Sequence, residues 1–483
     1  MIFSVFIILF FIILIALNIF FAIRRKNLMS YMLAGANLIS SAAAFFMSKG
    51  ICAGLSGKAV SIITKHLSSS YKNYNGIEVL KTTGIYNITY TFSRMFLSIG
   101  CFIVLYVLLY SILHIPVKII SKNFNNTGRK TCAVIVGILS AIIMFFVLIT
   151  PICALCHYMN TDTIDSKSYK KSYGAAVDDI YSNPFIKIFE KPGTGFADAL
   201  TGFEHDGKKY APFSEASTII KLVYGCSDLT SENVSAHTLT NSSANVKEAF
   251  SDSSLIPPAV LTISSTATSE WLAGKDFLKI DLKLNSSRTG AILKSTIKLV
   301  NEWDIQDVND MFETMVDFMC LAGSKNLFHD TSADNLLAAF SDNDFADDML
   351  MTFFTNDNLK EIVPYITYSG IGVAFDTIGI SLPDEDSINV DLSNMTEDDI
   401  HNEASIISSV AGAVYDIKTA NNSLSISKMS LSQITDLTIA LSGLSDSYFL
   451  KDFAVVIVND FLKKAGITNT MGNIFSDIFQ WLQ

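Results

Sequence analysis

Two long apolar runs, separated by a short basic turn, constrain this chain more than any other feature. The runs cover about 96–119 and 131–156. Each is long enough to cross the hydrocarbon core of a bilayer, which takes about 20 apolar residues in a helix. The turn between them carries three basic residues: Lys122, Arg129 and Lys130. The pattern predicts a pair of membrane-spanning helices joined by a basic loop.

Two further spans are predicted before this pair. Residues 2–23 form an almost purely apolar run, and three consecutive basic residues follow it. A cleaved signal peptide carries its positive charge before the apolar core, so this run is predicted to be an uncleaved anchor. Residues 27–48 carry Ala36, Ser40 and Ala44 at intervals of four, a spacing that lets two helices approach closely in lipid. We predict a second span here, with an interfacial or re-entrant helix as the alternative.

The two parts of the chain carry opposite charges. Residues 1–156 contain thirteen Lys and Arg but one acid, Glu78. The totals of 35 basic and 46 acidic residues therefore leave 22 basic and 45 acidic residues after Cys156. Nucleic acids bind to basic surfaces, so the balance of the second part argues against a nucleic-acid partner.

Loop charges predict how the spans are oriented. Short loops rich in Lys and Arg stay in the cytoplasm. Four spans place both basic loops on that side and both termini outside the cell, whereas three spans would place the acidic part inside.

Residues 50–67 are predicted to form an amphipathic helix on the membrane surface. Pro151 is predicted to kink or end the fourth helix.

Several local patterns occur together in the first 156 residues. A basic pair follows the first span, the second span is rich in small residues, and the third ends in Ile115-Pro116-Val117. The polar turn 123–128 leads into a fourth span patterned by Gly137 and small residues. In these features the chain resembles the colicin V production (CvpA) family. The resemblance implies a small helical membrane module linked to envelope processes and secretion, in a large Gram-positive-type version with a helical C-terminal domain.

The acidic part is predicted to be mainly α-helical, because its apolar residues recur at helical spacing. The clearest predicted helices are 308–321, 333–340, 347–354, 397–417, 431–441, 448–464 and 473–482. Thr396 and Asp399 are predicted to form a capping box at one of these helices. Residues 277–284 alternate with a period of two, which predicts one strand or hairpin.

A short phrase, apolar-Ser-Asp-x-x-apolar, occurs three times and begins at Phe250, Phe340 and Leu444. Ser and Asp are preferred N-cap residues, so each copy is predicted to join two helices. The spacing of roughly 90 to 100 residues is compatible with a degenerate helical repeat. Repeated use of a common capping phrase explains it equally well.

Few residues suggest chemistry. Cys153-Ala-Leu-Cys156-His157 matches the C-x-x-C-H pattern of covalent haem attachment, but it lies at the end of a predicted span. The simpler interpretation is two interfacial cysteines and a histidine that extends toward water, so we predict no cofactor. The acidic runs 342–348 and 384–391 lack the glycine and regular spacing of a calcium loop. They are predicted to be helix starts, with a weak calcium site as the alternative. We predict no metal site, and we find no catalytic motif.

These observations predict an all-α, multi-pass protein of the cell membrane. Residues 1–156 form a four-helix transmembrane module, and residues 157–483 form an acidic, mainly helical extracytoplasmic domain with degenerate repeats as one interpretation. Besides the lipid bilayer, we expect protein partners in the cell envelope and a non-catalytic role in envelope or secretion processes. One alternative is a channel or transporter component, with His114 as the ionisable residue inside the third span. Another is an extracytoplasmic sensor or enzyme whose site carries no recognised motif.

Overall fold

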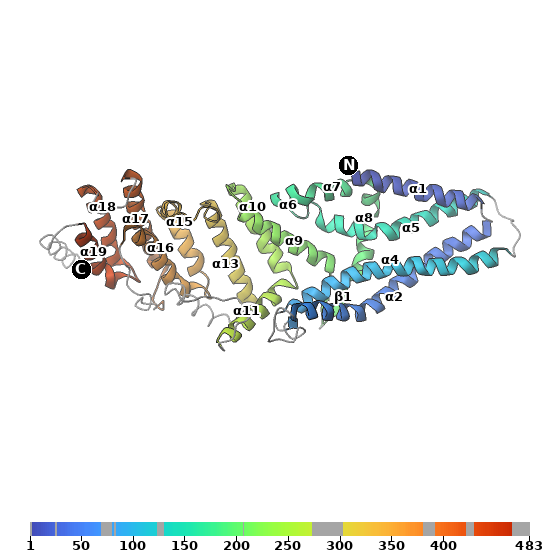
Figure 1. Ribbon diagram of the computed structural model, residues 1–483, viewed down its shortest axis with the longest axis horizontal. Coiled ribbons are helices and arrows are strands. Elements are labelled where there is room, and N and C mark those ends of the chain that lie inside the picture. Colours follow the sequence, from blue (N-terminus) through green and yellow to red (C-terminus); the bar gives the residue numbers. More distant parts are fainter. Residues whose placement is uncertain are drawn as a thin grey trace. The chain divides into compact units, whose positions relative to one another are not determined.

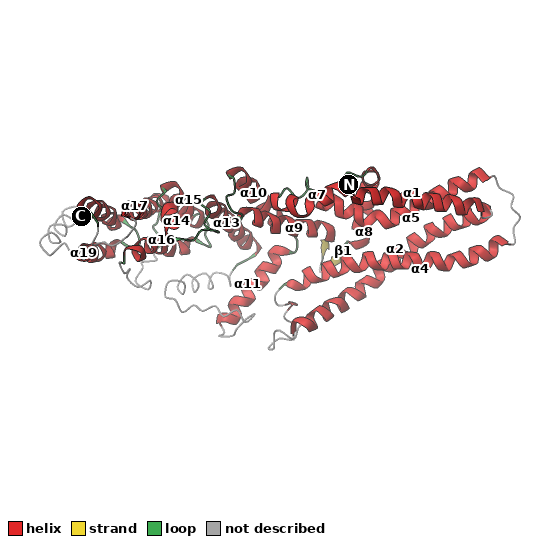
Figure 2. Ribbon diagram, turned by 45° about the horizontal axis from the view of Figure 1, so that its top comes forward, coloured by secondary structure: helices red, strands yellow, loops and turns green. Residues whose placement is uncertain are grey.

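The protein is almost entirely helical in the residues that its computed structural model describes. These are 2–24, 27–68, 80–81, 84–122, 130–205, 207–272, 303–379, 392–421 and 429–465. Among them only β1 (Phe203–His205) and β2 (Lys208–Tyr210) are strands, and they form one antiparallel hairpin (Figure 2). The predicted all-α class is confirmed. The strand predicted at 277–284 and the helix predicted at 473–482 lie outside the described residues.

The chain forms two compact units. The first comprises residues 1–226 and 248–263, and the second comprises 227–247 and 264–483. The first unit therefore includes more of the chain than the 156 residues of the predicted transmembrane module. Each unit is described by itself below.

Four helices of the first unit are long and apolar enough to cross a membrane (Figure 1). They are α1 (Ile2–Arg24), α2 (Asn27–Ser68), α4 (Ile85–Lys122) and α5 (Lys130–Met159). The first and last match the predicted spans closely. At 1.5 Å per residue, the 42 residues of α2 and the 38 of α4 each extend for about 60 Å. This is twice the hydrocarbon thickness of a bilayer, so both helices extend well beyond their apolar segments.

The prediction of a separate surface helix at 50–67 is wrong, because these residues continue α2 without a break. The buried side of α2 is a stripe of small residues at every fourth position, which packs along α4. It comprises Ala36, Ser40, Ala44, Ser48, Cys52 and Ser56, all buried. The same register continues through Val60 and Thr64, whereas Ile62 and Ile63 are exposed. Small residues at this spacing let helix axes approach closely, so close packing decides which side of α2 faces inward.

A buried polar contact joins three of the long helices. Asn37 of α2 is fully buried and donates to the carbonyl (3.0 Å) and the hydroxyl (3.2 Å) of Ser140 on α5. The Tyr106 hydroxyl of α4 donates to the Asn37 side-chain oxygen over 2.5 Å. Hydrogen bonds of this kind stabilise helix association in lipid. The contact therefore fixes α2, α4 and α5 in one register.

The last predicted span continues past its proline. Pro151 lies inside α5, which ends at Met159, so this proline does not end the helix. Beyond it come α6 (Lys167–Tyr169), the π-turn η1 (Lys170–Gly174), α7 (Ala175–Tyr181) and α8 (Pro184–Thr201). α8 packs mainly on α5 and also touches α4 and α2. Helices α9 (Pro212–Leu229), α10 (Ala236–Asp252) and α11 (Ile256–Leu272) follow the hairpin.

The second unit is a helical array around one apolar core. It includes residues 236–247 of α10 and 264–272 of α11. Its further elements are α13 (Ile305–Ser324), α14 (Ala333–Phe340), α15 (Asn343–Phe354), η3 (Lys360–Ile362), α16 (Val363–Ile378), α17 (Glu397–Asn421), α18 (Leu431–Ser442), η6 (Gly443–Asp446), η7 (Lys451–Phe453) and α19 (Ala454–Lys464). α17 is central, since it packs against α14, α15, α16 and α18. Six predicted helices are confirmed here, although the one expected to begin at Tyr448 begins at Ala454, after a 3-10 turn.

The predicted capping box at Thr396 and Asp399 is confirmed. The Thr396 N–H donates to Asp399 Oδ2 (2.8 Å), and the Asp399 N–H donates to Thr396 Oγ1 (3.3 Å). Each Ser-Asp phrase joins two helical segments. In the second copy the cap is the Asp of the pair, since Asp342 accepts the Asp344 N–H. In the first and third copies the cap is instead the serine after the pair: Ser253 and Ser447 each accept the N–H groups of the residues two and three positions on. Short polar side chains thus satisfy the unpaired amides at each joint.

Candidate functional site

The C-x-x-C-H residues lie on the last turns of α5. Cys153 and Cys156 are buried in an apolar cluster with Phe11, Phe145 and Ile186. A Cβ added at Gly193 of α8 would lie 2.9 Å from the Cys153 Cβ, so α8 closes directly over this thiol. Covalent attachment requires both thiols to reach one haem. The packed surroundings of Cys153 do not fit that requirement, and we assign no haem here.

His157 faces a polar cluster that the sequence analysis missed. Its Nδ1 lies 2.8 Å from Glu190 Oε1 of α8, which also accepts a hydrogen bond from the Tyr181 hydroxyl over 3.0 Å. The Tyr158 hydroxyl donates to Asp198 Oδ2 over 2.9 Å. Burial raises the pKa of Asp198 above its ordinary range. These contacts hold α8 against the end of α5, and no motif spacing marks them because the partners lie 33 and 40 residues apart.

His114, the residue on which the channel alternative depends, lies on α4 next to Tyr110. The two rings are 6.3 Å apart in an edge-on arrangement. An apolar groove lies between Phe6 and Phe10 of α1 and Ile149 and Ile152 of α5. Every side chain that lines this groove is apolar, and His114 is not among them.

The first acidic run lies at a helix start, as predicted, and it also forms ion pairs. Asp342 is the N-cap of α15 and pairs with Lys325 over 2.6 Å, and Asp347 pairs with His401 over 2.5 Å. The second run, 384–391, lies outside the described residues. Within the described parts of the chain, no group of three or more His, Cys, Asp or Glu residues is arranged to hold a metal ion.

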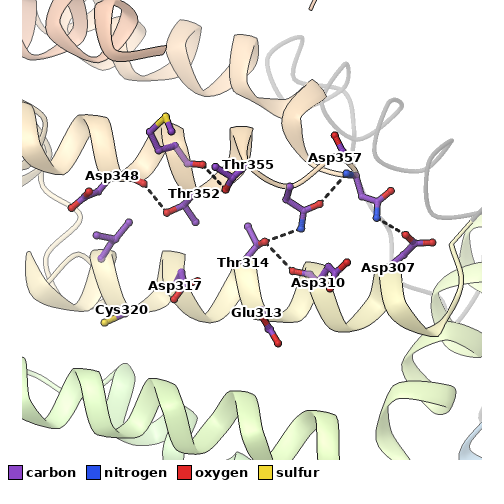
Figure 3. A pocket seen from close by; sticks show the side chains of 14 residues that line it. Asp307, Asp310, Glu313, Thr314, Asp317, Cys320, Asp348, Thr352, Thr355 and Asp357 are labelled. Atoms are coloured by element: carbon purple, nitrogen blue, oxygen red, sulfur yellow. Dashed lines mark hydrogen bonds between the residues drawn. The ribbon is translucent and has the colours of Figure 1, made fainter. Parts of the chain in front are cut away.

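A groove of the second unit lies between α13 and α15 and has a volume of about 770 Å³ (Figure 3). Its acidic side chains come from both helices and from the turn after α15. They are Asp307, Asp310, Glu313, Asp317, Asp348 and Asp357. The four on α13 recur every three or four residues, which places them on one side of the helix. Leu321 and Met351 add apolar surface.

Hydrogen bonds fix one end of this acidic groove. The Asn356 side chain donates to Thr314 Oγ1 over 2.8 Å, and the Asn358 side chain donates to Asp307 Oδ1 over 2.7 Å. Both contacts connect the turn after α15 to α13 (Figure 3). These two hydrogen bonds hold the turn after α15 directly against α13, although the segments lie about forty to fifty residues apart in the sequence. They therefore set the spacing of the two walls at this end of the groove.

The acidic groove keeps a negative balance after its internal ion pairs are counted. Lys247 pairs with Asp317 over 2.6 Å, and Lys360 pairs with Asp357 over 2.9 Å. Burial, together with the neighbouring acids, raises the pKa of Asp348. A cation placed here would relieve that repulsion. The groove is therefore suited to hold positively charged groups.

Two buried glutamates were also missed by the sequence analysis. Glu403 of α17 is fully buried; it accepts hydrogen bonds from the Ser447 hydroxyl (3.1 Å) and from the Tyr448 N–H. Glu215 of α9 accepts equivalent bonds from Ser253 (2.9 Å) and from the Ser254 N–H (3.0 Å). The joints at the first and third Ser-Asp phrases thus have the same hydrogen-bond pattern, in which a buried glutamate accepts from a serine hydroxyl and from the next backbone N–H. This likeness favours the repeat over chance use of a capping phrase.

Comparison with protein-family models, with curated protein sequences and with solved structures found no match for this chain. The resemblance of residues 1–156 to the CvpA family accordingly stays a prediction from the residues quoted above.

Proposed function

We propose that this protein is a non-catalytic integral membrane protein of the CvpA type. Its helical domain after residue 157 would lie outside the cytoplasm and bind a protein of the cell envelope, in envelope assembly or secretion. The observation that carries the proposal is the acidic groove between α13 and α15, in a chain with four helices suited to a membrane. Such a groove provides a recognition surface and requires no catalytic group.

The partner we propose is a Lys- or Arg-rich segment of another protein. The groove supplies six carboxylates from two helices and a turn, while two lysines neutralise part of this charge. Charge complementarity of this kind guides association and fixes the register of a partner. The apolar side chains of Leu321 and Met351 suit the aliphatic stems of lysine and arginine. A basic, amphipathic peptide therefore matches both properties of the groove.

A labelled peptide of alternating Lys and Leu tests the groove in the purified full-length protein. The triple variant Asp310→Asn, Glu313→Gln, Asp348→Asn is expected to weaken binding about tenfold, because three charge contacts of roughly 0.5 kcal/mol each are lost. Fluorescence anisotropy at several salt concentrations measures the change. A matched control neutralises three exposed acids outside the groove: Glu361, Asp416 and Asp436. Equal weakening by both triple variants would contradict a specific groove.

The proposed orientation has its own test, protease accessibility in intact cells. With four crossings, we expect a protease added outside to digest residues 157–483 without cell lysis. Western blots against an N-terminal and a C-terminal tag follow the fragments, and a cytoplasmic protein reports cell integrity. Protection in intact cells, with digestion after lysis, would indicate three crossings and an inward-facing domain. The proposed extracytoplasmic role would then be wrong.

A further inference from the structure

A pocket with a basic lining, called the basic pocket below, lies in the first unit, where the start of α4 meets the β-hairpin and α11. Its volume is about 460 Å³. Gly84, just before α4, has a positive φ of 68°, and a Cβ there would lie 2.8 Å from the Ala259 Cα of α11. This close backbone approach requires glycine and brings α11 against the start of α4. The pocket thus depends on contacts between three separate segments.

Basic side chains from these segments converge on the pocket. Lys81 precedes α4, while His205 and Lys208 belong to the two strands of the hairpin. His205 and Lys208 are directly paired across the hairpin, so their side chains share one face of it. None of the described residues that line the pocket is acidic.

Aromatic stacking holds the hairpin in place beside the pocket. Tyr90 of α4 stacks on His205, with centroids 5.5 Å apart, and Tyr86 stacks on Tyr90 at 6.0 Å. The Arg94 guanidinium lies 4.7 Å from the centre of the Phe203 ring. Offset aromatic stacking and cation–π contacts each add stability beyond burial. His205 and Lys208 therefore project from a hairpin that is held against α4.

The first turn of α11 contributes no free amide to this pocket. Ser253 accepts the N–H groups of Leu255 and Ile256, and two prolines follow them. Any attraction for an anion therefore comes from the basic side chains and from the positive end of α4. Tyr86 and Tyr210 line the same space and add hydroxyl groups. Together these groups match an anion that is part of a larger polar molecule.

We propose that this pocket binds a phosphate-bearing ligand, with Lys81, His205 and Lys208 contacting the phosphate. Several cationic donors from separate segments are typical of phosphate recognition. The start of α4 is eleven residues before Phe96, about 16 Å along the helix from the predicted hydrocarbon segment. A headgroup layer is about 5–8 Å thick on each side of the bilayer, so this position favours a water-soluble phosphate compound, with a phospholipid headgroup as the alternative source. The phosphate is the chemistry that they share.

Two probes applied to the purified full-length protein distinguish these sources. Calorimetry measures the binding of inorganic phosphate, which stands for a soluble ligand. Native mass spectrometry from mixed micelles measures the binding of phosphatidic acid, which stands for a lipid headgroup. We expect the double variant Lys81→Gln, Lys208→Gln to weaken binding of the active probe about tenfold, since two charge-assisted contacts are lost. The matched control variant Lys187→Gln, Lys191→Gln removes two exposed charges of α8. It should change the affinity for the same probe by less than about twofold.

Each outcome decides the proposal. Binding of inorganic phosphate that depends on the pocket lysines identifies a soluble ligand, and binding of phosphatidic acid alone identifies a lipid headgroup. If neither probe binds, or if the α8 variant weakens binding as much as the pocket variant, the proposal is wrong. The peptide-binding measurement on the acidic groove is independent of this result, because it concerns the other unit.

Discussion

Replacing Glu403 by alanine is expected to destabilise the second unit by about 2–4 kcal/mol. The carboxylate is fully buried and accepts hydrogen bonds from the Ser447 hydroxyl and the Tyr448 N–H. Without it, the buried Ser447 hydroxyl and the half-buried Tyr448 N–H lose their acceptor, and each unsatisfied buried donor costs about 1–3 kcal/mol. Hydrogen exchange of the full-length protein measures the change as a loss of protection in α17, α18 and α19. The exposed residue Glu361 gives a matched control, since its change to alanine should shift stability by less than about 0.5 kcal/mol.

Because of Glu403, we expect the free energy of unfolding to depend on pH in a definite direction. Burial raises the pKa of Glu403 to about 7. Between pH 4.5 and 7 the folded state therefore holds a proton that the unfolded state has released. The free energy of unfolding falls as the pH rises through this window, by up to about 3 kcal/mol from this group. Glu403→Gln cannot titrate and should flatten the profile; an unchanged slope in this variant would assign the pH dependence to other groups.

Replacing Ala44 by leucine is expected to disrupt the packing of α2 on α4. Ala44 is fully buried and belongs to one cluster with Phe102 and Tyr106 of α4. A larger side chain in a filled core typically costs 1–3 kcal/mol, because neighbouring side chains and backbone must shift. We expect the midpoint of thermal unfolding in detergent to fall by about 5 °C, as followed by size-exclusion chromatography after heating.

The control for this prediction lies two residues away. Ala42 is exposed on the same helix, so Ala42→Leu makes the same chemical change without entering the packed stripe. Its unfolding midpoint should stay within about 1 °C of the wild type. If both variants lower the midpoint equally, the effect would come from leucine in α2 and not from the contact with α4. The small residues would then have no special role in holding the two helices together.

The features that the sequence alone determined are those with local causes. Apolar runs of bilayer length specify the four long helices, because a helix satisfies its own backbone hydrogen bonds and needs only apolar side chains around it. The joints beginning at Phe250, Phe340 and Leu444 were also predictable. There a Ser or Asp side chain caps amides two or three residues away. Helix class and the positions of these joints therefore followed from residues that lie close together in the chain, although the helix expected at Tyr448 begins at Ala454.

Tertiary structure decided what depends on distant partners. The apolar periodicity of residues 50–67 pointed to a surface helix, yet the small side chains of α2 face inward because α4 is available to pack against them. A glutamate such as Glu403 is usually found at the surface, yet here it is buried. Its hydrogen-bond partners lie more than forty positions away in the sequence, so only the fold brings them to it. The acidic groove and the basic pocket each combine side chains from at least two separate segments. No local pattern records these pairings, because only the folded chain brings their charges together.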